Sequence, residues 1–80
     1  MKAKIFVTLK NQVLDTAGVA VENSINKNLG LNQVKNVRIG KLIEFDIESE
    51  NQDQASKVID DICDKLLVNQ VIEDYKFELK

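Results

Sequence analysis

The chain has 80 residues, of which 44% are hydrophobic and 30% charged, so it is long enough for one small core and too apolar for a disordered tail. Eleven lysines and arginines stand against thirteen aspartates and glutamates, and the net charge of -2 supplies no positive field that would attract a nucleic acid. We therefore expect a single domain over residues 1–80 that does not bind nucleic acid.

Missing residue types restrict the chemistry further. Without histidine, the chain alone cannot build a Ser-His-Asp triad or the common zinc sites. Its one cysteine, Cys63, can form neither an intramolecular disulfide nor a CxxC pair, which favours a reducing compartment. No apolar run approaches the roughly 18 to 20 residues of a membrane span, and the N-terminal apolar stretch is too short for a signal peptide. We expect a cytoplasmic chain with no catalytic, cofactor or metal site of its own.

The first half of the chain predicts a strand followed by a helix. Residues 3–9 alternate between apolar and polar side chains, with the period of two that is typical of a half-buried strand. A helix is expected from Asp15, a good capping residue, to Gly30, which can take the left-handed conformation that ends a helix. Gly18 in its first turn indicates either an irregular start or a point of close packing.

The second half predicts a hairpin, a helix and a last strand. Residues 37–47 alternate around Gly40, so we expect a hairpin that turns tightly at residues 39–41. Residues 51–70 return to helical spacing, with Cys63 on the apolar stripe, where a buried thiol packs as a hydrophobic group. Residues 71–79 alternate again and predict a final strand.

The element order predicts an α+β fold. Strand, helix, strand, strand, helix and strand, joined by right-handed crossovers, form the ferredoxin-like βαββαβ plait. We expect a four-stranded antiparallel sheet with two helices on one face. Phe6 and Leu42 then point to the open face, either as isolated apolar residues or as the centre of a self-association patch.

Several residues are candidates for a binding role, and each also has a purely structural explanation. Arg38 is the only arginine, and it is either a partner-contacting residue or a solvated strand residue. The pair Gly40-Lys41 lacks the GxxxxGK[ST] pattern of a phosphate loop. Glu73 and Asp74 are neighbours on a strand and point to opposite faces, so they cannot act as an acid and base pair. A regulatory plait that binds a small metabolite between two protomers remains an alternative, because such sites leave weak sequence signals.

Three ordered blocks of sequence carry a family resemblance. They read VTLKNQVLDTAG at 7–18, NVRIGKLIEFDIE at 36–48 and CDKLLVNQVIEDYKFEL at 63–79. Together they resemble the PurS family, the small subunit of phosphoribosylformylglycinamidine synthase, from end to end. Thr16 stands where the family often has a proline that would pre-set the helix start.

The resemblance implies a non-catalytic subunit of an ATP-dependent ligase of purine biosynthesis. In that enzyme a glutaminase subunit, PurQ, releases ammonia, and a synthetase subunit, PurL, uses ATP and magnesium to activate formylglycinamide ribonucleotide. The small subunit is expected to bind no cofactor, to form a homodimer or higher oligomer, to bridge PurL and PurQ and to assist ammonia transfer. The interface residues expected from the hairpin, the last strand and the open face are Arg38, Gly40, Lys41, Asn69, Glu73, Asp74, Tyr75, Phe6 and Leu42.

Overall fold

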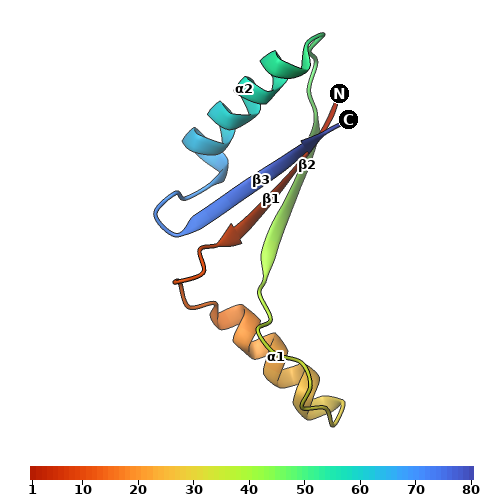
Figure 1. The fold of residues 1–80 in the computed structure, drawn as a ribbon, viewed down its shortest axis with the longest axis vertical. Coiled ribbons are helices and arrows are strands. Elements are labelled where there is room, and N and C mark those ends of the chain that lie inside the picture. Colours follow the sequence, from red (N-terminus) through yellow and green to blue (C-terminus); the bar gives the residue numbers. More distant parts are fainter.

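A computed structural model describes residues 1–80 and contains three strands and two α-helices (Figure 1). Each helix follows a strand, but the two helices lie at opposite ends of the molecule. In chain order the elements are β1 (Lys2–Leu9), α1 (Thr16–Asn28), β2 (Gly40–Asp46), α2 (Gln52–Ile62), the π-helical turn η1 (Cys63–Leu67) and β3 (Glu73–Leu79).

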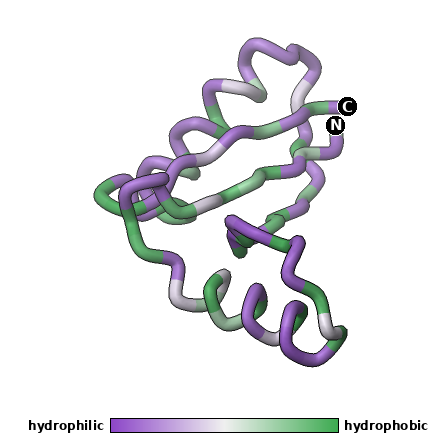
Figure 2. The backbone as a smooth tube through the Cα atoms, turned by 60° about the horizontal axis from the view of Figure 1, so that its bottom comes forward, coloured by the Kyte–Doolittle hydropathy of each residue, from purple (hydrophilic) through white to green (hydrophobic).

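The three strands form one antiparallel sheet in the order β2-β1-β3. The alternation of hydrophobic and hydrophilic residues along the strands is visible in Figure 2, and it divides the sheet into an apolar inner face and a mixed outer face. On the inner face Ile5 lies opposite Ile43 on one side and Phe77 on the other. The two ends of the chain also pair, because the N–H of Lys2 donates to the carbonyl of Lys80 at 2.8 Å.

Helix α2 covers the inner face. Asn51 caps it by accepting hydrogen bonds from the backbone of Asp53 and Gln54, which satisfies two N–H groups that a helix start leaves free. Its buried residues recur every four positions, so they form one stripe that packs on the middle strand. The hydrophobic core of the sheet and α2 consists of Ala3, Ile5, Val7, Ala55, Ile59, Cys63 and Val68.

Helix α1 does not lie on the sheet, and it extends from one end of the sheet with residues 31–39 running back beside it (Figure 1). We call residues 31–39 the strap, and α1 with the strap the arm. Asp15 caps α1 as expected, and Gly30 takes the left-handed conformation after the helix, with φ of 65°. The predicted limits of this helix are therefore confirmed, while its predicted place on the sheet is wrong.

The expected four-stranded sheet and its hairpin are also wrong, although the α+β class is confirmed. Residues 37–39 form no strand, because the N–H groups of Val37 and Ile39 donate to Glu22 and Asp15 beside α1. Gly40 does not turn the chain but begins β2, where its backbone lies so close to β1 that a Cβ would come within 2.7 Å of the carbonyl of Val7. The glycine therefore serves close packing at this position.

The extended arm gives the chain a large surface for its size. The accessible surface is 6035 Å², whereas size scaling gives about 4,900 Å² for a folded monomer of this mass. The radius of gyration is 16.2 Å, against about 12 Å expected for 80 residues. Only 9 of 80 residues are buried, so much of the apolar surface has no cover within one chain.

Candidate functional site

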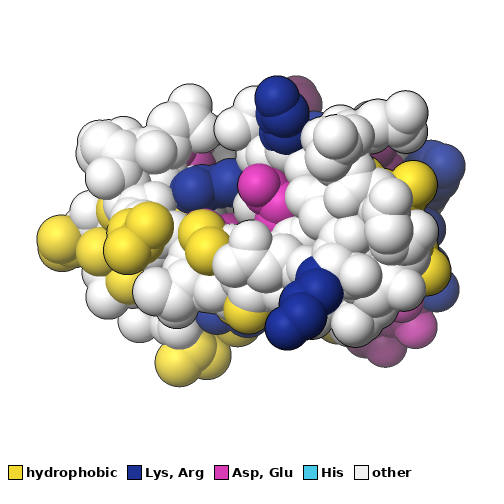
Figure 3. Space-filling view, turned by 90° about the horizontal axis from the view of Figure 1, so that it is seen from below, with side chains coloured by type: hydrophobic (Ala, Val, Ile, Leu, Met, Phe, Trp, Pro, Cys, Tyr) yellow, Lys and Arg dark blue, Asp and Glu magenta, His cyan; other side chains and the backbone are white.

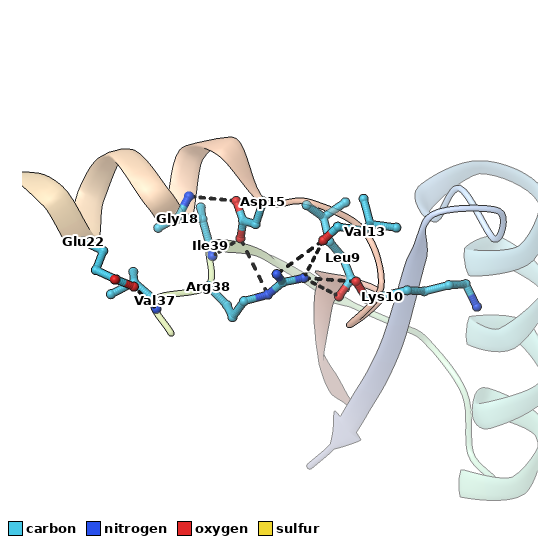
Figure 4. Close-up of polar contacts among 9 residues, drawn as sticks. All are labelled: Leu9, Lys10, Val13, Asp15, Gly18, Glu22, Val37, Arg38 and Ile39. Carbon is cyan, nitrogen blue, oxygen red and sulfur yellow. Dashed lines mark hydrogen bonds and ion pairs between the residues drawn. The ribbon is translucent and has the colours of Figure 1, made fainter. Parts of the chain in front are cut away.

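The arm meets the sheet at a junction built around the buried side chain of Asp15 (Figure 4). One carboxylate oxygen accepts a hydrogen bond from the N–H of Gly18 at 2.8 Å, and the other accepts from the N–H of Ile39 at 2.8 Å. The hydrogen bond from Ile39 is the main reason why the pKa of Asp15 lies below its usual value, and the hydrogen bond from Gly18 comes next. The charge of Arg38 acts in the same direction. A single carboxylate thus ties the start of α1 to the end of the strap.

Arg38 ties the same junction to the end of β1. Its guanidinium donates to the carbonyls of Leu9, Lys10 and Val13 at 3.0 to 3.4 Å, and its Nε lies 3.9 Å from Oδ2 of Asp15 (Figure 4). A planar group with five donors suits this bridge between several acceptors. The structure therefore gives Arg38 contacts within the chain, and a partner contact through its exposed edge stays a prediction.

The strap is bound to α1 at three successive turns of the helix. Gly18 lies so close to it that a Cβ would come within 2.2 Å of the carbonyl of Val37. One helical turn later, Glu22 accepts from the N–H of Val37 at 3.1 Å. After a further turn, the Asn26 side chain donates to the carbonyl of Val34 at 3.0 Å. Of the two alternatives that the sequence left open for Gly18, an irregular helix start or a point of close packing, the structure shows close packing.

Most of the predicted interface residues lie in three adjacent rows across the sheet, near the arm. Each row joins one residue from each strand in the order β2, β1, β3. The rows are Leu42–Phe6–Lys76, Lys41–Val7–Tyr75 and Gly40–Thr8–Asp74, and Glu73 follows beside Leu9. The structure therefore brings together residues that are more than 60 positions apart in the sequence, while it places Arg38 at the neighbouring junction. Their contact with a partner stays a prediction.

Ion pairs and a tight turn order this end of the sheet. Lys41 pairs with Glu73 at 3.3 Å across β1, and Lys10 pairs with Asp74 at 3.1 Å. Glu73 also accepts from the N–H of Asn69 at 2.8 Å, and this hydrogen bond is the main reason why its pKa lies below the usual value. Asn69 in turn accepts from Val71, so it builds the turn into β3. The result is a pre-ordered polar surface.

A shallow hollow of about 260 Å³ lies at the same end and is polar. Tyr75 on its wall donates its hydroxyl to Asp60 of α2 at 2.9 Å. This hydrogen bond is the first cause that raises the pKa of Tyr75 to about 12, followed by burial and the negative charge of Asp60. The lining residues are Lys10, Asp64, Gln70, Glu73, Asp74 and Tyr75.

On the outer face, Phe6 and Leu42 are direct cross-strand neighbours. Leu42 is 55% exposed, while Phe6 is half-buried and has the ammonium of Lys76 at 5.7 Å from its ring centre. Lys4 pairs with Glu44 at 3.7 Å beside them. The apolar part of this face is therefore small and surrounded by charges, and a role of Phe6 and Leu42 in self-association stays a prediction.

Sequence reasoning missed two features of this surface. It assigned no role to Asp15 beyond the helix cap, since nothing along the chain shows that a carboxylate will also bind residue 39. It also expected α1 to be covered by the sheet, so it did not list Leu14, Val21 or Leu29 as exposed. No signal in the sequence marks them as exposed, because a helix that carries only Glu22 and Lys27 as charged residues is equally expected to pack on its own sheet.

The described side chains offer no reactive constellation. Cys63 is fully buried, and burial followed by the negative charges of Asp60 and Asp64 raises the pKa of its thiol, so it stays protonated. No group of three or more acidic or cysteine side chains is placed to hold a metal ion. No helix combines the length and the apolar character that crossing a bilayer requires.

Comparison with known proteins covers nearly the whole chain. Residues 2–80 match the family described as PurS, Phosphoribosylformylglycinamidine (FGAM) synthase. The chain is 47% identical to the FGAM synthase subunit PurS of Synechocystis, over 95% of this chain and 75% of the relative. It is 42% identical to PurS of Bacillus subtilis, over 99% and 92%. It superposes with a TM-score of 0.89 on a chain in the structure of PurLQS from Thermotoga maritima, at 35% identity over 96% and 93% of the two chains. The chain belongs to the PurS family of FGAM synthase.

Proposed function

We propose that the chain is a non-catalytic, self-associating subunit of FGAM synthase that joins the glutaminase subunit PurQ to the synthetase subunit PurL. The complete enzyme converts formylglycinamide ribonucleotide to formylglycinamidine ribonucleotide at the expense of glutamine and ATP. In this proposal ATP and magnesium are bound by PurL, and this chain binds neither. The similarity to a chain in the PurLQS structure of Thermotoga maritima supports the assignment.

The observation that carries the proposal is the uncovered surface. The chain has about 1,100 Å² more accessible surface than size scaling gives for its mass, whereas a standard protein interface buries about 800 Å² on each partner. Twelve large hydrophobic residues are exposed, and two of them, Leu66 and Val71, are more than three quarters exposed. Such a chain lowers its free energy by binding other surfaces.

The polar end of the sheet offers an ordered surface on which a partner can dock in one orientation. Lys41, Glu73, Lys10 and Asp74 are held in place by ion pairs within the chain, so little side-chain entropy is lost when a partner docks there. We assign this end of the sheet, with the hollow beside Tyr75, to contacts with the larger subunits. Holding PurQ against PurL would keep released ammonia on a protected route between the two active sites.

Reconstitution tests the proposal. PurL and PurQ from the same source are assayed with and without this chain, using either glutamine or ammonium as the nitrogen donor. We expect the chain alone to hydrolyse neither glutamine nor ATP. Its addition should raise the glutamine-dependent rate while leaving the ammonium-dependent rate nearly unchanged, because the chain contributes to transfer and not to synthesis. An unchanged glutamine-dependent rate would refute the proposal.

The alternative of a metabolite-sensing plait is not favoured by the comparisons. A regulatory ligand at 100 times its Kd would stabilise the fold by about 2.7 kcal/mol. A thermal-shift screen of metabolites on the isolated chain separates this alternative from the proposal, which expects no such shift.

A further inference from the structure

Strand β3 forms one edge of the sheet, and alternate backbone groups along it have no partner. The strand order β2-β1-β3 places no strand beyond β3. Lys2 and Lys80 exchange both of their backbone hydrogen bonds, at 2.8 and 3.1 Å, so every second residue of β3 counted from Lys80 bonds β1. The residues between them, Tyr75, Phe77 and Leu79, therefore direct their N–H and C=O groups away from the sheet. These groups are free to bond a further strand.

This edge is regular along its whole length. Every residue of β3 from Glu73 to Leu79 pairs with β1 without a bulge, and the chain contains no proline. Natural sheet edges are commonly protected by bulges, prolines or charged side chains that stand at the edge. Lys76, the lysine in the middle of β3, instead has its ammonium 5.7 Å from the centre of the Phe6 ring on β1. The edge is therefore a template on which another strand can pair.

Two hollows lie along this edge, and Asp74 and Tyr75 belong to the walls of both. One is the polar hollow of about 260 Å³, between the start of β3 and the turn η1. The other has about 320 Å³, lies on the outer face and is lined by Phe6, Thr8, Asp74, Tyr75 and Lys76. No hollow of the chain has a residue of β2 in its wall. Only the β3 edge therefore combines free backbone groups with space for the side chains of an added strand.

The polar hollow carries an excess of negative charge. Its wall holds the carboxylates of Asp64, Glu73 and Asp74 and a single ammonium, that of Lys10. Lys10 pairs with Asp74, and Lys41 pairs with Glu73 from across the sheet. Asp64 takes part in no ion pair within the chain. Figure 3 views the molecule from below and shows basic and acidic side chains next to one another. A further basic side chain is complementary to this hollow.

We propose that β3 accepts an extended segment of one larger subunit of FGAM synthase as a further strand of the sheet. Successive side chains of a strand point to opposite faces, so two neighbouring residues of the incoming segment enter the two hollows. A lysine or arginine fits the polar hollow, and an apolar or aromatic residue fits the outer hollow beside Phe6. Main-chain hydrogen bonds supply affinity, and the two side chains supply specificity. The inference rests on the proposed function and deepens it, because it names the mode of contact.

A methyl group on one backbone nitrogen tests the strand pairing directly. Residues 63–80 begin with Cys63, so they can be made by chemical synthesis and joined to residues 1–62 by native ligation to give the full-length chain. N-methylation of Phe77 removes an outward N–H and leaves the hydrogen bonds to β1 and all side chains in place. PurL and PurQ are titrated with this chain in the presence of glutamine and ATP, and the unmethylated ligated chain is the control. We expect half-maximal activity to require at least about tenfold more of the methylated chain.

Reversing one charge tests the polar hollow. Asp64→Lys places a cation where the incoming basic side chain should lie, and it should raise the half-maximal concentration severalfold. The matched control is Glu50→Lys, which makes the same change of charge at an exposed position in the loop before α2. Glu50 lines no hollow, so this control should behave as the wild-type chain does.

Amide hydrogen exchange identifies the source of the strand. The amides of Tyr75, Phe77 and Leu79 should exchange more slowly with either PurL or PurQ present, whichever supplies the segment. Light scattering should give the methylated and unmethylated chains the same mass. Unchanged exchange, equal activation by both chains, equal effects of Asp64→Lys and Glu50→Lys, or a lower mass of the methylated chain, which would mean that β3 pairs two copies, would each overturn the strand addition. If the wild-type chain raises the glutamine-dependent rate and the methylated chain raises it equally, the strand addition is wrong and the subunit function stands.

Discussion

The Nε of Arg38 lies 3.9 Å from a carboxylate oxygen of Asp15, and this pair fixes the direction of the arm. Arg38 reaches the carbonyls at the end of β1, while Asp15 holds the first turn of α1 and the end of the strap. A single arginine and a single buried carboxylate therefore join the end of β1, the first turn of α1 and the end of the strap.

Replacing Asp15 with Asn should destabilise the chain most at neutral pH. The folded state lowers the pKa of Asp15 from 3.8, so its ionised form stabilises the fold above that pH, and the contribution is lost as the pH falls through the folded pKa. We expect the difference in unfolding free energy between wild type and Asp15→Asn to shrink below about pH 4. Urea unfolding measured at several pH values checks this. A difference that is constant with pH would contradict the role given to the carboxylate.

Gly18→Ala should destabilise the chain, which is the reverse of the usual effect in a helix. Alanine normally stabilises a helix interior by about 1 kcal/mol relative to glycine. Here its Cβ would come within 2.2 Å of the backbone carbonyl of Val37, so the strap must move, and we expect a net loss of about 1 to 3 kcal/mol. Ser24→Ala, at an exposed position of the same helix, is the control and should be neutral or slightly stabilising. A gain in stability for Gly18→Ala would contradict the close packing of strap and helix.

Arg38→Ala should weaken assembly more than it weakens the fold. Its hydrogen bonds at the junction are partly exposed, so their loss should cost the isolated chain about 1 kcal/mol. The freed arm, however, no longer presents α1 in one direction, and mixtures with PurL and PurQ should need more of the variant for half-maximal glutamine-dependent activity. Arg38→Lys should not restore assembly, because one ammonium cannot bridge several carbonyls and a carboxylate. Assembly equal to wild type would remove Arg38 from the interface.

Tyr75 should ionise near pH 12, and the chain offers a clean way to observe it. It is the only tyrosine and there is no tryptophan, so the ultraviolet spectrum during alkaline titration reports this side chain alone. The hydrogen bond to Asp60 is the main cause of the raised pKa, and Asp60→Asn should therefore lower it. Since the raised pKa favours the protonated folded state, its contribution to stability is complete below about pH 10 and disappears as the pH rises toward 12. A midpoint at the ordinary value in the folded chain would show that the contact with α2 is absent.

Local structure was largely predictable from the sequence. The alternation in residues 3–9 identified β1, Asp15 and Gly30 marked both ends of α1, and the stripe through Cys63 identified the buried side of α2. Each of these features depends on neighbours within a few positions. The family was also recognisable from three ordered blocks, and the comparisons confirm it.

The placement of the strap was not predictable in this way. Val37 and Ile39 alternate with polar residues as a strand would, but their N–H groups are bound by carboxylates of Glu22 and Asp15 and not by another strand. A period of two shows that backbone is extended and does not show what it pairs with. The prediction of a hairpin at Gly40 was wrong for a related reason. In the sequence, a glycine required for close packing cannot be distinguished from a glycine required for a turn.

The most direct test of the central claim is the rate of FGAM formation from glutamine by PurL and PurQ, measured as this chain is added. We predict that the chain alone is inactive and that the rate rises with its concentration until each complex is filled, while the rate with ammonium changes little. Turnover of glutamine or ATP by the isolated chain, or a full glutamine-dependent rate without it, would contradict the account.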